Sequence, residues 1–167
     1  MAYRNKTYAC FDGDTDMRYF NLLKAWHAND RFDFSYFDAH GLTQARDSST
    51  EESIKRSLRE RLNNTREFLL LIGENTKNLY RFVRWEIEVA LKLDLPIIAV
   101  NLNGMREMDA KLCPPILKDE LAIHIPFGQK IMDYALDRWP EQHEKQKKLG
   151  KSSPFLYPVT VYKQLGL

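Results

Sequence analysis

The feature that most constrains the fold of this chain is a regular alternation of short apolar runs with helical patterns. Three runs are continuously apolar, as strands covered on both faces are, and they span residues 8–11, 68–72 and 96–100. Residues 32–37 alternate between apolar and polar, which is typical of an edge strand, and residues 121–125 form a fifth candidate. Strands that alternate with helices predict an α/β fold with a parallel sheet between helical layers.

Helical patterns occupy the segments between these runs. Ser49 and Glu52 stand at the two positions of a capping box, and apolar residues follow at helical spacing. Because crossovers are right-handed and the alternating run fits an edge, the sequence predicts a flavodoxin-like three-layer sandwich with five parallel strands in the order 2-1-3-4-5. Residues 1–130 are predicted to form this domain. Residues 131–167 are predicted to be a helical extension packed on it, with Pro140 breaking or restarting its helix.

Composition excludes several classes of protein. The chain has 25 Lys and Arg against 23 Asp and Glu, a net charge of +2 that is too balanced for an electrostatic nucleic-acid binder. No apolar run approaches the roughly 20 residues of a membrane span. Residues 1–6 do not open a signal peptide, and Cys10 and Cys113 are too far apart for a CxxC site. We therefore expect a cytoplasmic protein without nucleic-acid or membrane partners.

Two strand ends are predicted to border a ligand pocket. Ligands of such sheets bind beyond the carboxyl ends of the strands, where the strand order reverses, and residues 11–14 and 73–76 lie there. Asp12-Gly13-Asp14-Thr15 resembles the DxDx(T) signature of haloacid-dehalogenase phosphatases, and a receiver-like acidic pocket would bind Mg²⁺. The other parts of both sites are missing from the sequence, so no metal site is expected. In the simplest interpretation, one of these aspartates caps the next helix.

Glu86 stands out in the helix that follows the third strand. At about 100° per residue, it falls inside the apolar arc formed by Phe82, Val83, Val89 and Ala90. A carboxylate in that position loses solvation, and perturbed carboxylates near clefts are candidates for functional groups. The alternative is a first-turn glutamate that the helix dipole stabilises and whose head reaches solvent. The residue pattern leaves both interpretations open.

Several motifs along the chain together resemble a known family. In order they are Tyr8-Ala9-Cys10-Phe11-Asp12, Leu22-Leu23-Lys24-Ala25-Trp26, Ala45-Arg46-Asp47-Ser48, Leu71-Ile72-Gly73-Glu74-Asn75-Thr76, Trp85-Glu86-Ile87-Glu88 and Leu95-Pro96-Ile97-Ile98-Ala99-Val100. Over roughly residues 6–126, the set resembles the TIR-like family that includes the ThsB proteins of bacterial Thoeris antiphage systems. TIR domains carry their catalytic glutamate in a Trp-Cys-x-x-Glu motif. This chain keeps that spacing up to Glu86, with Phe82 in place of Trp and Val83 in place of Cys.

The resemblance implies an enzyme that cleaves NAD at the nicotinamide–ribose bond, with NAD as substrate and with no bound cofactor. It assigns the catalytic role to Glu86, whose carboxylate stabilises positive charge on the ribose. Substrate binding falls to Phe11 or Trp85, which would stack on a ring, and to Asp12, Asp14 and Asn75, which would position hydroxyls. The implied product is a cyclic ADP-ribose-type signal that activates an effector protein in antiphage defence.

A second function class stays open beside the enzyme. Many TIR domains act by self-association or by docking to a partner, without turnover. The departures at Phe82 and Val83 fit such an interaction module, although the enzyme is the favoured interpretation. The sequence thus predicts either an NAD-cleaving signalling enzyme or a non-catalytic module that forms homo-oligomers or binds a signalling partner.

Overall fold

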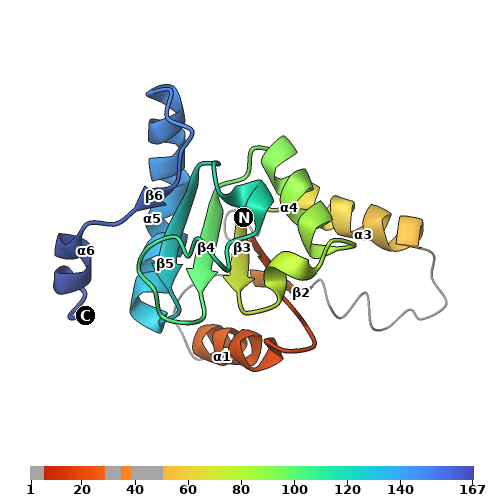
Figure 1. The fold of residues 1–167 in the computed structure, drawn as a ribbon, viewed down its shortest axis with the longest axis horizontal. Coiled ribbons are helices and arrows are strands. Elements are labelled where there is room, and N and C mark those ends of the chain that lie inside the picture. Colours follow the sequence, from red (N-terminus) through yellow and green to blue (C-terminus); the bar gives the residue numbers. More distant parts are fainter. Residues whose placement is uncertain (1–5, 29–34, 39–50) are drawn as a thin grey trace.

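One parallel sheet of six strands organises the molecule. The computed structural model describes residues 6–28, 35–38 and 51–167 (Figure 1). The strands are hydrogen-bonded in the order β2-β1-β3-β4-β5-β6, and every neighbouring pair is parallel. They are β1 (Lys6–Cys10), β2 (Ser35–Asp38), β3 (Glu67–Ile72), β4 (Ile97–Asn101), β5 (Ala122–Pro126) and β6 (Phe155–Leu156).

The sheet has six strands and not the predicted five. The additional strand, β6, pairs with β5 at the far edge, through Ile123 with Phe155 and His124 with Leu156. A strand of two residues is too short to show a period-2 pattern, so no local pattern predicts it. At the opposite edge, the structure describes only the last part of the predicted run, as β2.

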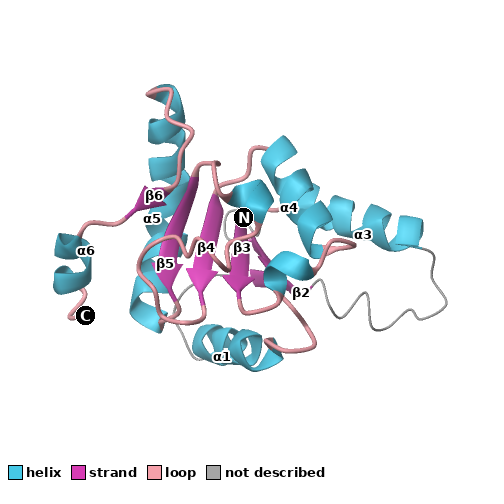
Figure 2. Ribbon diagram, viewed as in Figure 1, coloured by secondary structure: helices cyan, strands magenta, loops and turns pink. Residues whose placement is uncertain are grey.

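Helices cover both faces of the sheet (Figure 2), which makes three layers. Two helices and a short terminal one pack on one face, and two further helices with a 3₁₀ turn pack on the other. The first group is α1 (Met17–Ala28), α5 (Gln129–Lys148) and α6 (Val159–Gln164). The second group is α3 (Glu51–Asn63), α4 (Val83–Lys92) and the 3₁₀ turn η3 (Pro115–Leu117). Another 3₁₀ turn, η2 (Thr76–Asn78), follows β3. No described helix is long and apolar enough to cross a membrane.

The two helical layers explain why the central runs are continuously apolar. Tyr8 and Phe68 pair across β1 and β3 and stack at 5.5 Å in the core beneath α3 and α4. Their neighbours Ala9 and Leu69 point the other way, into the core beneath α1 and α5. Every residue of β4 is buried as well. Successive side chains of these strands enter two different cores, which confirms the interpretation of the continuously apolar runs.

The amphipathic pattern of α3 is confirmed. Ile54, Leu58 and Leu62 form a buried stripe on that helix, which begins at Glu51. The predicted capping residue Ser49, like residues 45–48 of the family-like motif, lies outside the described residues.

The C-terminal third contains a long helix that belongs to the core. Ile131, Met132 and Trp139 of α5 are buried against the sheet. The expected interruption at Pro140 is wrong, because α5 continues through this proline to Lys148. A proline in a helix removes one amide hydrogen bond and its ring crowds the carbonyl four residues earlier, and packing of the flanking turns on the core offsets this cost. The proposed boundary after residue 130 stays a prediction.

Glu67, at the start of β3, is a buried acid. Its side chain is 2 % exposed, and the Thr7 hydroxyl donates to its Oε1 at 3.1 Å. Burial raises the pKa of Glu67 to about 8, although the Thr7 hydrogen bond and the charge of Arg66 oppose this shift. Glu67 is therefore expected to be protonated in the folded protein at neutral pH.

We expect Glu67 to lower the free energy of unfolding as the pH rises from about 4.5 to about 8. In this range the folded protein keeps a proton that the unfolded chain has released, so stability is greatest at low pH and is lost with increasing pH. The effect is at most about tenfold in the unfolding equilibrium constant per pH unit. Urea unfolding of the parent and of Glu67→Gln at several pH values measures it, with the exposed Glu60→Gln as control. An equal pH dependence in all three proteins would contradict this assignment.

Candidate functional site

A cavity of about 370 Å³ lies at the carboxyl end of the sheet, beside the first turn of α1. In Figure 1 the arrowheads of β3, β4 and β5 point toward α1, so the cavity is at the edge where ligands of such sheets bind. Three segments line it: the start of α1, the end of β3, and the loop between β4 and η3. Their lining residues are Thr15, Asp16, Arg18, Tyr19, Ile72, Gly73, Glu74, Asn75, Leu102, Asn103 and Leu112.

Asp12 holds together the turn between β1 and α1. Its Oδ1 accepts a hydrogen bond from the Asp14 amide at 3.0 Å, and its Oδ2 accepts from the Thr15 hydroxyl at 2.6 Å and from Asn75 Nδ2 at 3.4 Å. Burial by itself would raise the pKa of Asp12, but these hydrogen bonds outweigh it and lower that pKa. The carboxylate therefore organises the turn before α1; it does not cap that helix, because its partners Asp14 and Thr15 precede Met17, where α1 begins.

Asp14 and Asn75 both lie close to Asp12, but only Asn75 lines the cavity. Asp14 is exposed. The Asn75 side chain donates to Asp12 and accepts from Asn78 Nδ2 at 3.0 Å, so it links β3 to the turn after β1. The structure thus brings three of the predicted substrate-binding residues into one hydrogen-bonded group.

The buried carboxylate that does line the cavity is Asp16, which was not among the predicted site residues. Its side chain is 7 % exposed and lies against Gly73, where a β-carbon would overlap the carboxylate. Burial, together with the charges of Asp12 and Glu74, raises the pKa of Asp16. Asp16 follows Asp12 and Asp14 in the sequence, but no sequence pattern indicates that Gly73 packs against this particular aspartate.

Glu86 lies in the first turn of α4 with only 4 % of its side chain exposed. The prediction of a desolvated carboxylate is therefore confirmed, and the alternative in which its head reaches solvent is wrong. Burial raises the pKa values of Tyr8 and Cys10 on β1, and the neighbouring charge of Glu86 raises them further. From the sequence we expect Glu86 in the cleft bordered by residues 11–14 and 73–76, and this expectation is wrong. Glu86 instead faces the sheet from the α3–α4 layer and does not line the cavity at that edge.

The two predicted stacking residues lie in different environments. Phe11 has no exposed surface and stacks on Phe20 of α1 at 4.6 Å, so its ring belongs to the core. Trp85 is half-buried on α4, with Lys55 Nζ 5.4 Å and Arg59 Cζ 5.6 Å from its ring centroid. Neither ring lines the cavity at the end of the sheet.

The acidic residues after β1 do not form a metal centre in the described part of the chain. Within residues 6–28, 35–38 and 51–167, no three His, Cys, Asp or Glu side chains are placed to hold a metal ion. Both carboxylate oxygens of Asp12 accept hydrogen bonds from the protein, and Asp14 is exposed. This geometry gives Asp12 a structural role in the turn.

We therefore expect no Mg²⁺-dependent hydrolysis of a generic phosphomonoester such as p-nitrophenyl phosphate. Asp12 is buried with both oxygens hydrogen-bonded within the turn, and the described residues provide no metal group beside it. Release of nitrophenolate by the parent protein with Mg²⁺ measures this activity. If such hydrolysis appears and is lost in Asp12→Asn, Asp12 is a nucleophile and the phosphatase interpretation is correct.

Comparison with protein families gives one further finding. Residues 8–107 match the family described as Thoeris protein ThsB, TIR-like domain. The matched segment contains Asp12, Asn75, Trp85 and Glu86, and it ends in the loop after β4.

Proposed function

The chain belongs to the TIR-like family of Thoeris ThsB proteins, and we propose that it cleaves NAD at the bond between nicotinamide and ribose. The observation that carries this proposal is the buried carboxylate of Glu86 in the first turn of α4. It has the spacing from Phe82 that the resemblance to TIR domains gives the catalytic glutamate, and it lies inside the matched segment.

The proposed reaction breaks the bond between C1′ of the ribose and the nicotinamide nitrogen. The bonding electrons leave with nicotinamide, which becomes neutral, and positive charge develops on the ribose as an oxocarbenium ion. A carboxylate beside the ribose stabilises this charge, as it does in glycoside hydrolysis. Glu86 is shielded from water next to Tyr8 and Cys10, and electrostatic stabilisation is stronger in such an environment.

The fate of the ribose cation determines the product. Attack by water at C1′, with loss of a proton, gives ADP-ribose; attack by a nitrogen of the adenine in the same molecule gives a cyclic ADP-ribose-type signal. We favour the cyclic product, which an effector protein would detect in antiphage defence. The protein would act in the cytoplasm, where NAD is available, and homo-oligomers would form its active state.

Residues around Asp12 would bind the rest of the dinucleotide. Cys10 of β1 lies beside Glu86 and is two positions before Asp12. With its nicotinamide ribose at Glu86, the rest of the dinucleotide would therefore lie at the carboxyl end of β1. The exposed Asp14 carboxylate and the Asn75 amide are available to position its hydroxyls. Trp85, the half-buried residue that precedes Glu86 in α4, would stack on the nicotinamide or the adenine ring.

Incubation of the purified chain with NAD tests the proposal, with nicotinamide and the nucleotide products separated by chromatography. We expect release of nicotinamide together with a nucleotide that migrates differently from linear ADP-ribose. Protein that is inactive alone is then assayed with lysate of phage-infected cells, which supplies a trigger. Absence of nicotinamide in both assays would contradict the enzymatic proposal.

One observation favours the interaction module as the second candidate. Glu86 is buried against β1, and it does not line the cavity of about 370 Å³ at the carboxyl end. A glutamate with this placement also suits a domain that signals by self-association. In that case the same NAD assays show no turnover, and the oligomeric state measured by light scattering changes on addition of the infected-cell lysate.

A further inference from the structure

We propose that a groove between α4 and η3 is a docking site for an acidic segment of another protein. The segment inserts one apolar side chain into the groove and places its carboxylates beside Lys77 and Arg84. None of the residues assigned to NAD lines this groove, so the proposal does not depend on the proposed function. We call it the α4–η3 groove; the side chains that would meet the segment are Lys77, Tyr80, Val83, Arg84, Ile87 and Ile116.

The α4–η3 groove has an apolar floor. Val83 and Ile87 lie one turn apart on α4 and are buried, and half-buried Ile116 lines the same groove from η3. The volume of the groove is about 70 Å³. A bound water needs roughly 10–15 Å³, whereas small-molecule sites span about 300–1,000 Å³. The groove therefore suits a single apolar side chain of a peptide and is too small for most free ligands.

Tyr80 stands at the edge of this groove with 64 % of its side chain exposed. It belongs to the short segment between η2 and α4. A tyrosine ring offers a large contact area with a polar tip, and tyrosine is enriched among the residues that dominate the binding energy of interfaces. Tyr80 can thus cover the inserted side chain and shield it from water.

The wall that η3 contributes is already formed. Pro114 and Pro115 open this turn, their rings fix the backbone φ angle, and Leu117 at its end is buried in the core. A wall that does not have to be ordered on binding lowers the entropy cost of docking.

The charge of the groove and of the surface beside it is positive. Lys77 and Arg84 line the groove, and none of the described residues that line it is an acid. Because α4 packs against both η3 and α3, the exposed cations of α3 lie next to this face. A second hollow there, beside Trp85, is lined by three cations and one acid: Lys55, Arg56, Arg59 and Glu52. A partner with complementary charge is therefore acidic.

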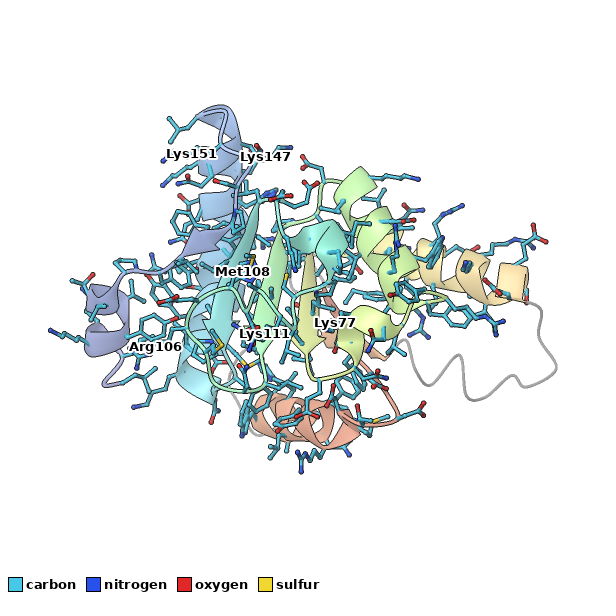
Figure 3. The ribbon with its side chains drawn as sticks, viewed as in Figure 1. Lys77, Arg106, Met108, Lys111, Lys147 and Lys151 are labelled. Atoms are coloured by element: carbon cyan, nitrogen blue, oxygen red, sulfur yellow. The ribbon has the colours of Figure 1, made fainter. Side chains whose placement is uncertain are left out.

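Both cations of the groove remain able to bind a carboxylate. Lys77 Nζ donates to the Lys111 carbonyl at 2.7 Å, and Figure 3 labels both lysines. An ammonium group has three N–H donors, so this hydrogen bond leaves others for a partner. Arg84 Nε lies 3.4 Å from Glu88 Oε1, and an exposed ion pair of this kind contributes little and exchanges readily for another.

A second copy of this chain does not supply the complementary segment. In the described part of the chain, no exposed large apolar side chain is adjacent in sequence to an acid without an ion pair. Leu149, the most exposed of them, lies between Lys147 and Lys151, which Figure 3 labels far from Lys77. Asp94, which follows exposed Leu93, is paired with Lys147. The charge of the groove therefore favours a different protein as the partner.

Selection of a display library of random short peptides on the purified full chain tests the proposal. We expect the selected peptides to carry aspartate or glutamate next to a leucine, a methionine or an aromatic residue. One of them, synthesised with a fluorescent label, is then titrated with the chain while its fluorescence anisotropy is recorded. Tyr80→Ala and Arg84→Glu should each weaken binding by at least about tenfold, because they remove the cover of the groove and reverse its charge.

Arg138→Glu is the matched control. Arg138 is an exposed residue of α5 that pairs with a neighbouring acid, Asp137, at 3.3 Å, as Arg84 pairs with Glu88. Arg138→Glu should bind the peptide as the parent does. A peptide in which lysines replace the acids should bind Arg84→Glu more tightly than it binds the parent. Thermal unfolding of each variant verifies its fold.

Several results would overturn the proposal. They are no enrichment of any peptide, selected peptides without acids, or equal binding of the labelled peptide by Tyr80→Ala, Arg84→Glu and the parent. A dimer of the chain alone that light scattering detects and that Tyr80→Ala abolishes would make the groove an interface between copies. Binding to phosphatidylserine vesicles that Arg84→Glu abolishes would make this face a membrane-binding surface. No measurement uses NAD, so failure of the proposed enzymatic function would be seen separately.

Discussion

Glu86→Gln is expected to lower the rate of NAD cleavage by about 10²–10³-fold. Glutamine keeps the size of the side chain and removes the negative charge that would stabilise the ribose cation. The rate of nicotinamide release by parent and variant, under conditions in which the parent is active, measures the effect. A variant as active as the parent would contradict the catalytic assignment.

A stability measurement and a matched control accompany this result. Because a buried carboxylate is costly to keep ionised, Glu86→Gln should unfold at the same temperature as the parent or higher. Glu88 lies two positions further along α4 and forms an ion pair with Arg84 at 3.4 Å near the surface. Glu88→Gln should leave NAD cleavage nearly unchanged. If both variants lose activity equally, general damage to α4 explains the loss, and the charge of Glu86 does not.

Trp139→Ala is expected to lower the free energy of unfolding by about 3–5 kcal/mol. The Trp139 side chain has no exposed surface, and its ring packs 5.3 Å from that of Phe155 and 5.8 Å from that of His143. Its removal leaves a cavity between α5 and β6, which the core cannot fill completely. Urea unfolding measures the loss, with Leu149→Ala as control because Leu149 is 68 % exposed.

Loss of buried contacts from α5 also predicts the effect of cutting the chain at the proposed boundary after residue 130. A chain that ends there loses Ile131, Met132 and Trp139, which cover the sheet together with α1. We expect this truncated chain to fail to give a cooperative unfolding transition. A stable fragment 1–130, or a Trp139→Ala variant as stable as the parent, would show that the C-terminal segment is a separable appendage.

The position of Glu86 could be predicted because it depends on local periodicity. A helix that follows a buried strand must bury its apolar face, and Glu86 falls inside that face whatever the other segments do. The same holds for Ile54, Leu58 and Leu62 on α3. Spacing within one helix was sufficient in both cases.

Phe11 and Asp16 could not be assigned in this way. Both are close to the predicted pocket in sequence, but the roles of neighbouring side chains depend on what packs against them. Phe11 stacks on Phe20 in the core, and Asp16 packs against Gly73 and lines the cavity. These contacts join segments whose relative placement no local pattern specifies.

The sequence by itself determined the α/β class, the parallel sheet, the apolar faces of the helices and the place of Glu86 inside one of these faces. These follow from periods of two and 3.6 residues and from the rule that buried strands have no polar face. Only the tertiary structure decided that Glu86 faces Tyr8 and Cys10 and that Asp16, not Glu86, lines the cavity at the carboxyl end of the sheet. The reason is physical: a period assigns a side chain to a face, and the segments that meet there decide its neighbours and its solvation.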